Sequence, residues 1–291
     1  MLTKIITFNA KDDIILNGII YKNNKKTNKI IIQVHGMTSN CFKKRNQIIA
    51  NTITDISVDT FDFNNRGSDV IRYISDGKSK KLAGTAYENI EECYYDIVGA
   101  IEYVLSLGYE DIYLQGHSLG STKVVYTYNR LLKEHSNLID KIKGIILLSL
   151  VDITGIIKQS PIYKYMKIAE EKEKNKEIME MMPIESFIHP MSVKNYLMYT
   201  KYNSQFDFAK YDEKDNKFEA LNNIQCPLFM RWGNVNEMII QDASDLSNLL
   251  NKKIKNKVKD ISYIDGANHG YHDKEQILAD EIKAFLTKIL Y

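Results

Sequence analysis

The sequence predicts an α/β fold in which a mostly parallel central sheet is covered by helices on both faces. Apolar strand segments alternate with amphipathic helical segments along most of the chain, which is the pattern of such sheets. Residues 29–34 are almost continuously apolar, as expected for a strand that is buried on both faces. One long interval, residues 153–222, contains no predicted strand and interrupts this alternation.

Composition is consistent with one large domain that carries an insertion. The chain has 291 residues, of which 44% are hydrophobic, and a net charge of +2. This charge gives no case for nucleic-acid binding. The cysteines, Cys41, Cys93 and Cys226, are odd in number and widely spaced, which argues against a disulfide framework and against a zinc site. Residues 1–11 lack the features of a signal peptide, and no apolar run is long enough to span a membrane. We therefore expect a cytoplasmic protein with no stable membrane anchor.

The first third of the chain is predicted to supply the edge of the sheet and its first buried strand. Two antiparallel strands are joined by a turn around Lys11, Asp12 and Asp13. An alternating segment further on ends in a polar loop, Asn64 to Ser68. The predicted elements are strands at residues 4–8, 14–21 and 29–34, a helix from about residue 42 to 50, and a strand at 56–63.

The middle and the end of the chain continue the alternation. Residues 89–107 form the strongest predicted helix, with Asn89 and Glu92 in a capping-box pattern and Gly108 at its end. Asp273 and Gln276 are expected to cap the last helix. Between these helices we predict strands at 111–114, 144–150, 228–232 and 261–264, and a helix at 122–135.

The interval 153–222 is interpreted as a helical cap over the sheet edge that carries the chemistry. It is rich in methionine and aromatic residues, which suit an adaptable apolar pocket, although many of them are expected to form the core of the cap itself. The predicted organisation is thus a core formed by residues 1–152 and 223–291, with the cap insertion at 153–222.

The chain contains a Gly-x-Ser-x-Gly motif at Gly116 to Gly120. It follows a short apolar strand and precedes a predicted helix, which is the context in which this motif forms a nucleophile elbow around Ser118. Side chains at the two glycine positions would collide with the neighbouring strand and helix. The helix directs its N-terminus at the serine, where it stabilises a developing negative charge.

A serine hydroxyl needs a base to accept its proton, and among the six histidines His269 is best placed for this task. It lies in a glycine-flanked loop directly after the last predicted strand. His272 is close by but should already enter the final helix, and His117 is expected to pack beside the nucleophile. His135 and His189 are interpreted as surface or cap residues.

These motifs together resemble the α/β-hydrolase superfamily, in particular small serine esterases and lipase-like enzymes. The resemblance rests on His35-Gly36, on the Ser118 motif and on Gly266-x-Asn268-His269-Gly270, in the family's order. It implies an oxyanion hole made of the backbone N–H groups of Met37 and Leu119, which agrees with the need for fixed donors at a tetrahedral intermediate. A structural task is expected for His35 itself. A weaker similarity links the chain to siderophore (fusarinine-type) esterases, through residues 148–152, 191–197 and 233–238.

The acid of the triad is where the chain departs from this family. Family members usually carry an aspartate about three residues after the glycine that follows the strand, and here that residue is Asn236. An amide accepts a hydrogen bond from the histidine but does not balance the imidazolium charge. We favour Glu237, the next residue, as the acid. Asp152, which follows the preceding strand, and Asn236 acting alone are the alternatives.

Two functions are consistent with these residues. The leading hypothesis is a serine hydrolase that cleaves carboxylic esters or thioesters of small molecules through an acyl-enzyme, without a metal or cofactor. The alternative, motivated by Asn236, is a catalytically silent binding protein that retains the fold and the pocket. The sequence does not indicate the acyl group, the alcohol or the oligomeric state.

Overall fold

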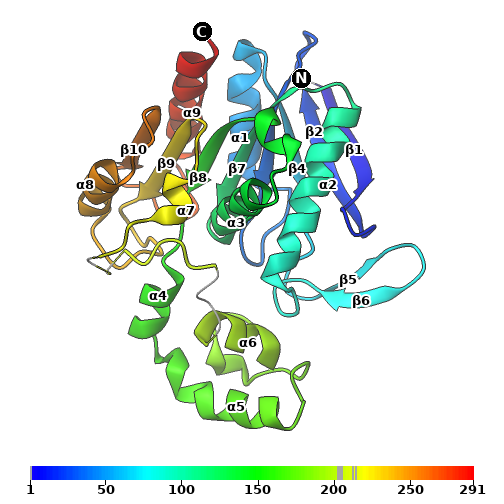
Figure 1. Cartoon of the computed structure of the whole chain (residues 1–291), viewed down its shortest axis with the longest axis vertical. Coiled ribbons are helices and arrows are strands. Elements are labelled where there is room, and N and C mark those ends of the chain that lie inside the picture. The colour runs from blue at the N-terminus through cyan, green and yellow to red at the C-terminus, as the bar shows by residue number, and fades with distance from the viewer. Residues whose placement is uncertain (1, 202–205, 212, 214) are drawn as a thin grey trace.

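The computed structural model describes residues 2–201, 206–211, 213 and 215–291. Its main sheet has eight strands among these residues, in the order β1-β2-β4-β3-β7-β8-β9-β10 (Figure 1). β1 and β2 run antiparallel to their neighbours, and all pairs from β4 to β10 are parallel. The strands are β1 (Leu2–Asn9), β2 (Ile15–Lys22), β3 (Lys29–Val34), β4 (Asp59–Phe63), β7 (Asp111–His117), β8 (Ile142–Leu148), β9 (Leu228–Gly233) and β10 (Lys259–Ile264). The predicted, mostly parallel sheet is confirmed.

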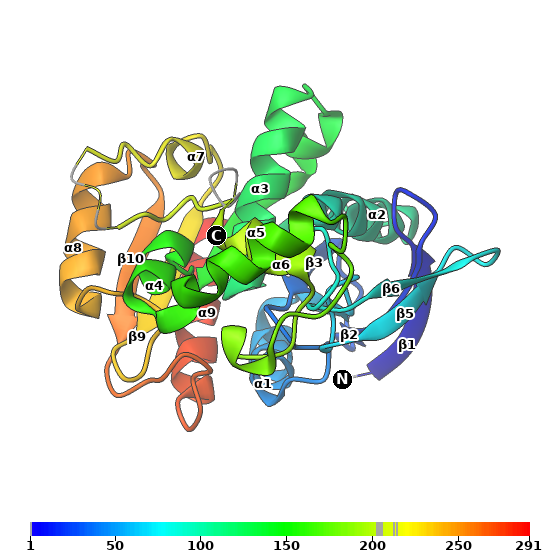
Figure 2. The same ribbon diagram turned by 90° about the horizontal axis from the view of Figure 1, so that it is seen from below.

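Helices cover both faces of this sheet (Figure 2). α2 (Cys93–Ser106), α3 (Leu119–Lys133) and α8 (Ala243–Lys253) lie on one face, and α1 (Lys44–Ile53) and α9 (Glu275–Leu290) lie on the other. The packing of β3 on both faces explains why its sequence is mostly apolar. Ile30 and Ile32 pack on the α2 and α3 side, whereas Ile31 packs on the α1 and α9 side. Each such buried side chain contributes about 1.5–3 kcal/mol to folding. Among the described residues, no helix combines the length and apolarity that crossing a bilayer requires.

The segment predicted as a cap divides into two parts by its packing. α4 (Ile153–Gln159), α5 (Met166–Lys174) and α6 (Val193–Thr200) lie beyond one end of the sheet (Figure 1) and share an apolar cluster that includes Met182, Met191 and Tyr196. In contrast, Tyr211 and Phe218, near the short helix α7 (Glu219–Asn222), pack in the main core. Residues 202–205, 212 and 214 of the segment lie outside the described residues. The assignment of this segment as a cap, and its boundaries, stay predictions.

Several predicted boundaries differ from those in the structure. The helix expected at 89–107 starts as a 3₁₀ turn, and Asn89 accepts a hydrogen bond from the Glu91 backbone N–H instead of forming a capping box. The capping expected at the last helix is wrong, because α9 begins at Glu275 with no side-chain cap and Asp273 has a left-handed backbone with φ of 61°.

The 3₁₀ turns among the described residues are η1 (Thr54–Ile56), η2 (Ile90–Glu92), η3 (Asn137–Lys141), η4 (Pro161–Tyr165) and η5 (Ile184–Ser186).

A two-stranded hairpin and a helix, α8, were not predicted. The hairpin of β5 (Arg72–Ser75) and β6 (Lys80–Ala83) buries only Ile74 and Ala83, so it shows too little apolar alternation to be recognised. Helix α8 had a readable signal, since Leu246 and Leu250 are spaced by one turn and Asp242 caps it by accepting from Ser244 and Asp245 N–H groups.

Candidate active site

Ser118 occupies a sharp turn between β7 and α3. Its backbone has φ of 56° and ψ of −127°, a conformation that a non-glycine residue rarely adopts and that costs about 1–3 kcal/mol. The flanking glycines make this turn possible. A Cβ at Gly116 would lie 2.4 Å from the carbonyl oxygen of Gly120, and one at Gly120 would lie 2.1 Å from the carbonyl oxygen of Val34 on β3. Helix α3 starts at Leu119, directly after the serine and three residues earlier than predicted.

The loop after β3 lies against this turn. A Cβ at Gly36 would lie 2.9 Å from Ser118 Cβ and 3.4 Å from the backbone nitrogen of Leu119, so only a glycine permits the approach. Met37, the next residue, lines the same cavity as Ser118 and Leu119. His35 is buried and accepts a hydrogen bond at Nε2 from the Asn65 N–H, at 3.2 Å. Burial and the charge of Lys123 lower the pKa of His35 to about 3, so it holds the loop as a neutral ring.

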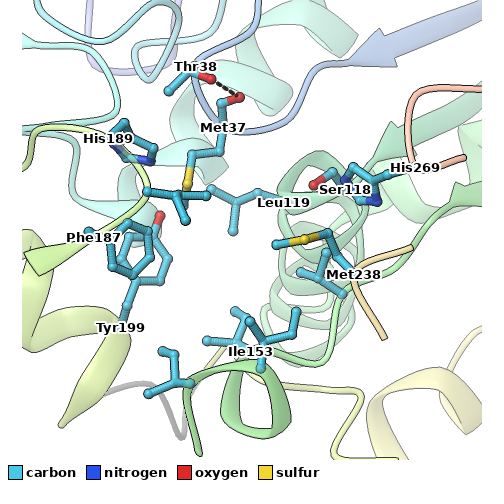
Figure 3. A pocket seen from close by; sticks show the side chains of 14 residues that line it. Met37, Thr38, Ser118, Leu119, Ile153, Phe187, His189, Tyr199, Met238 and His269 are labelled. Carbon is cyan, nitrogen blue, oxygen red and sulfur yellow. Dashed lines mark hydrogen bonds between the residues drawn. The ribbon is translucent and has the colours of Figure 1, made fainter. Parts of the chain in front are cut away.

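His269 lies in the loop between β10 and α9 and lines the cavity with Ser118 (Figure 3). Its Nδ1 contacts Oε1 of Glu237. Its main-chain carbonyl accepts a hydrogen bond from Nε2 of His117, at 2.7 Å. Burial, followed by the charge of Arg45, lowers the pKa of His117 well below its usual value, so this ring is neutral. His117 therefore packs beside the serine and supports the backbone of the His269 loop.

Glu237 is held by four partners, and its side chain is only 3% exposed. Besides His269, it accepts hydrogen bonds from the N–H groups of Gly233 and Met238, both at 2.9 Å, and from the Ser149 hydroxyl at 2.8 Å. Burial opposes its ionisation, but the hydrogen bond and charge of His269, together with the two N–H groups, lower the pKa of this carboxyl. Glu237 is thus an ionised carboxylate fixed at Nδ1 of a histidine.

The other two acid candidates lie elsewhere. Asn236 is exposed and has a left-handed backbone with φ of 49°, which asparagine tolerates better than most residues. Asp152 is fully buried at the start of α4, where its carboxylate accepts from the N–H groups of Gly155 at 2.8 Å and Tyr211 at 3.1 Å. Of the three candidates, Glu237 therefore contacts His269. Asp152 instead links the start of α4 to the main core.

Replacing Asp152 with alanine is expected to destabilise the protein by roughly 2 kcal/mol or more, because a helix cap is lost and two N–H groups are left without this acceptor. Urea unfolding followed by circular dichroism measures this change. The milder variant Asp152→Asn should keep kcat within a few-fold of wild type. A fall of several orders of magnitude in Asp152→Asn, with stability unchanged, would instead place Asp152 at the histidine.

Sequence reasoning missed the residues that support Glu237 from behind. The Ser149 hydroxyl lies 3.0 Å from the hydroxyl of Tyr271, which donates to the carbonyl oxygen of Arg231 at 2.8 Å. Ser149 directly follows β8 and Tyr271 lies two residues after His269. The strand predicted at 144–150 extends past Ser149, which hid its position at the end of β8, and nothing in the sequence distinguishes Tyr271.

The cavity at Ser118 is largely apolar and has a volume of about 240 Å³. Figure 3 shows Met37, Leu119, Phe187, Tyr199 and Met238 around it, so its walls come from the β3 loop, from α3, from the predicted cap and from the Glu237 loop. His189 also lines it, and its Nε2 is buried without a hydrogen-bond partner among the described residues. The described residues contain no group of three or more His, Cys, Asp or Glu side chains arranged to hold a metal ion.

The fold is that of known α/β-hydrolases. Similar solved structures include the siderophore hydrolase EstB from Aspergillus fumigatus, with a TM-score of 0.72, 13% identity, and coverage of 99% of this chain and 98% of that one. Est1E from Butyrivibrio proteoclasticus, solved with ferulic acid bound, has a TM-score of 0.65, 17% identity, and coverage of 98% and 99%. A soluble variant of monoglyceride lipase from Saccharomyces cerevisiae has a TM-score of 0.64, 14% identity, and coverage of 99% and 95%. These neighbours include esterases and a lipase, and at such identities the likeness establishes the fold, as the sequence motifs predicted.

Comparison with curated proteins gave no match. A family model, in contrast, matches residues 83–290, a span that contains Ser118, Glu237 and His269. The chain therefore belongs to the family described as "Protein of unknown function (DUF1749)", within the α/β-hydrolase fold.

Proposed function

We propose that this protein is a serine hydrolase that cleaves carboxylic esters or thioesters through an acyl-enzyme. The observation that carries the proposal is the contact between the ionised Glu237 carboxylate and Nδ1 of His269, in a loop that lines the same cavity as Ser118. A histidine fixed in this way carries its free lone pair on Nε2, which is what a base for a serine hydroxyl requires. The strained turn at Ser118 adds support, because strain of this kind is retained where it serves a site.

In this mechanism, Ser118 Oγ attacks the acyl carbonyl carbon while His269 Nε2 accepts the hydroxyl proton. Glu237 stabilises the resulting imidazolium, and the N–H groups of Met37 and Leu119 stabilise the oxyanion. The imidazolium then protonates the departing alcohol or thiol, leaving the acyl group on Ser118. Water, deprotonated by His269, attacks the acyl-enzyme, and the imidazolium returns this proton to Ser118 Oγ as the acid is released. The apolar cavity of about 240 Å³ provides space for a small apolar group of the substrate.

Labelling with a fluorophosphonate tests this proposal. Because the probe reacts with an activated serine, the purified wild-type protein should be labelled covalently, and Ser118→Ala should not. A matched control is Ser106→Ala, which removes an exposed hydroxyl at the end of α2 and should be labelled like wild type. Intact-protein mass spectrometry measures the stoichiometry.

Absence of labelling in folded wild-type protein, at every pH tested, would contradict the proposal and favour the catalytically silent binding protein. Labelling that persists in Ser118→Ala would place the reactive residue elsewhere. Neither result would affect the assignment of the fold.

A further inference from the structure

A second cavity, of about 330 Å³, opens beside the same serine. It shares Met37, Thr38, Ser118 and His269 with the apolar cavity, but most of its other lining residues are polar or charged. They come from the loop after β3, from the end of β7, from the start of α1 and from the loop that leads into α9. Ser118 therefore borders an apolar cavity and a polar cavity.

Arg45 is the unusual residue of the polar cavity. It lines the cavity although it is only 7% exposed. Its Nε and Nη2 both donate to Oδ1 of Asn46, at 3.2 and 3.1 Å, and no carboxylate of the described residues lies within the 4.0 Å of an ion pair. Arg66, which is also buried, binds Asp12, Glu92 and Asp96. Buried charges are normally paired, so the guanidinium of Arg45 has unused binding capacity.

The charges around Arg45 do not neutralise it. Lys44 Nζ lies 3.4 Å from Oε1 of Glu275, so these two charges of the cavity wall pair with each other. Asp62 is separated from Arg45 by the Asn46 side chain, and burial raises the pKa of Asp62 well above its usual value. Burial lowers the pKa of Arg45 to about 10, and it outweighs the opposing effects of Tyr271, Asp62 and Glu275, so the cation is only partly compensated. The remaining charged wall residues, Lys43 and Asp273, are both exposed.

The start of α1 adds to this positive character. α1 has ten residues, no acidic residue in its first turn, and no side-chain cap from Lys43. The N-terminus of a helix carries a partial positive charge, so cationic residues there are unfavourable unless an anion binds. Free backbone N–H groups at such an end are suitable donors to a carboxylate or a phosphate.

We propose that the polar cavity binds an anionic group of the substrate, a carboxylate or a phosphate, with Arg45 as its main charge partner. The substrate would then be an ester or thioester that joins a small apolar group, held in the apolar cavity, to a group that carries the anion. This inference rests on the proposed function, because Ser118 lies where the two cavities meet. Arg45 acts here in substrate recognition and takes no part in bond cleavage.

Pairs of uncharged and anionic esters of equal shape test this specificity in the wild-type protein. With the anion on the alcohol, the pair is the butyrate ester of hydroxypropanoate and that of hydroxypropanamide. With the anion on the acyl group, the pair is monobutyl succinate and butyl succinamate. The butyrate ester of hydroxyethyl phosphate tests phosphate in place of carboxylate. Chromatography of the released acid or alcohol gives kcat/KM for each.

At least one anionic ester should exceed its uncharged counterpart by about tenfold or more in kcat/KM, which corresponds to about 1.4 kcal/mol. In Arg45→Gln this ratio should fall towards one. The matched control Arg130→Gln removes the same charge from α3, where Arg130 pairs with Glu134, and should keep the wild-type ratio. Arg45→Lys should keep part of the preference, because it retains the charge without the fork of donors.

Equal kcat/KM for all anionic and uncharged esters in wild type would overturn the anion site, and so would a preference that survives in Arg45→Gln. The wild-type ratios alone decide the question if Arg45→Gln does not fold. Hydrolysis of the uncharged esters without any anionic preference would remove this inference and leave the proposed function intact. Absence of both ester hydrolysis and fluorophosphonate labelling would remove both.

Discussion

Replacing Ser118 or His269 with alanine is expected to lower kcat for short p-nitrophenyl esters by about 10⁶-fold, the magnitude found when a nucleophile or base is removed from a serine hydrolase triad. The reason is chemical: without Ser118 no acyl-enzyme forms, and without His269 the hydroxyl keeps its proton. Because the two residues act as a unit, the double variant should be hardly slower than either single one. Stopped-flow or steady-state release of p-nitrophenol measures the effect, and circular dichroism checks the fold.

The matched control for the base is His272→Ala. His272 lies three residues after His269 but is exposed on the wall of the polar cavity, so its loss should leave kcat for an uncharged ester near the wild-type value. If His269→Ala retained most of its turnover while His272→Ala did not, His272 would be the base, and the contact between Glu237 and His269 would serve structure only.

The second large effect concerns the acid. Glu237→Gln should lower kcat by about 10³- to 10⁴-fold, because the amide removes the charge that stabilises the imidazolium and can favour the wrong tautomer of His269. The change should fall on kcat more than on KM, since His269 is protonated in the transition state and not in the ground state. The amide keeps the side-chain shape but only one acceptor oxygen, so it cannot accept at both carboxylate positions, where Gly233 and Ser149 bind one oxygen and Met238 the other. Steady-state kinetics on one activated ester measures both constants.

Asn236→Asp is the matched control for this loop. Asn236 is exposed and its left-handed backbone also accepts aspartate, so the new carboxylate should change kcat only slightly. A strong gain of activity in Asn236→Asp, together with a mild effect of Glu237→Gln, would contradict the role proposed for Glu237. It would show that the native site operates with an amide in the place of the acid.

Local patterns were sufficient to predict the fold and part of the candidate site. The apolar run of β3 marks a strand buried on both faces, because alternate side chains point to opposite faces and all of them meet a helix layer. Gly116 and Gly120 identify the turn at Ser118 for an equally local reason, since side chains at these positions would overlap the backbone of α3 and β3. The position of His269 after the last strand follows from the parallel sheet, whose carboxyl ends lie on one edge.

Only the tertiary structure shows which acid candidate contacts His269. The sequence favoured Glu237 but left Asn236 and Asp152 open, because each of the three follows a strand on the same edge of the sheet. The left-handed turn at Asn236 leaves that side chain exposed and Glu237 buried against His269, which is 32 residues away. The sequence also did not predict that Tyr211 and Phe218 pack in the main core. Nor did it predict that Arg45 is buried without a carboxylate partner among the described residues. Periodicity and local sterics act within a few residues, whereas contacts between distant loops depend on how the whole chain packs.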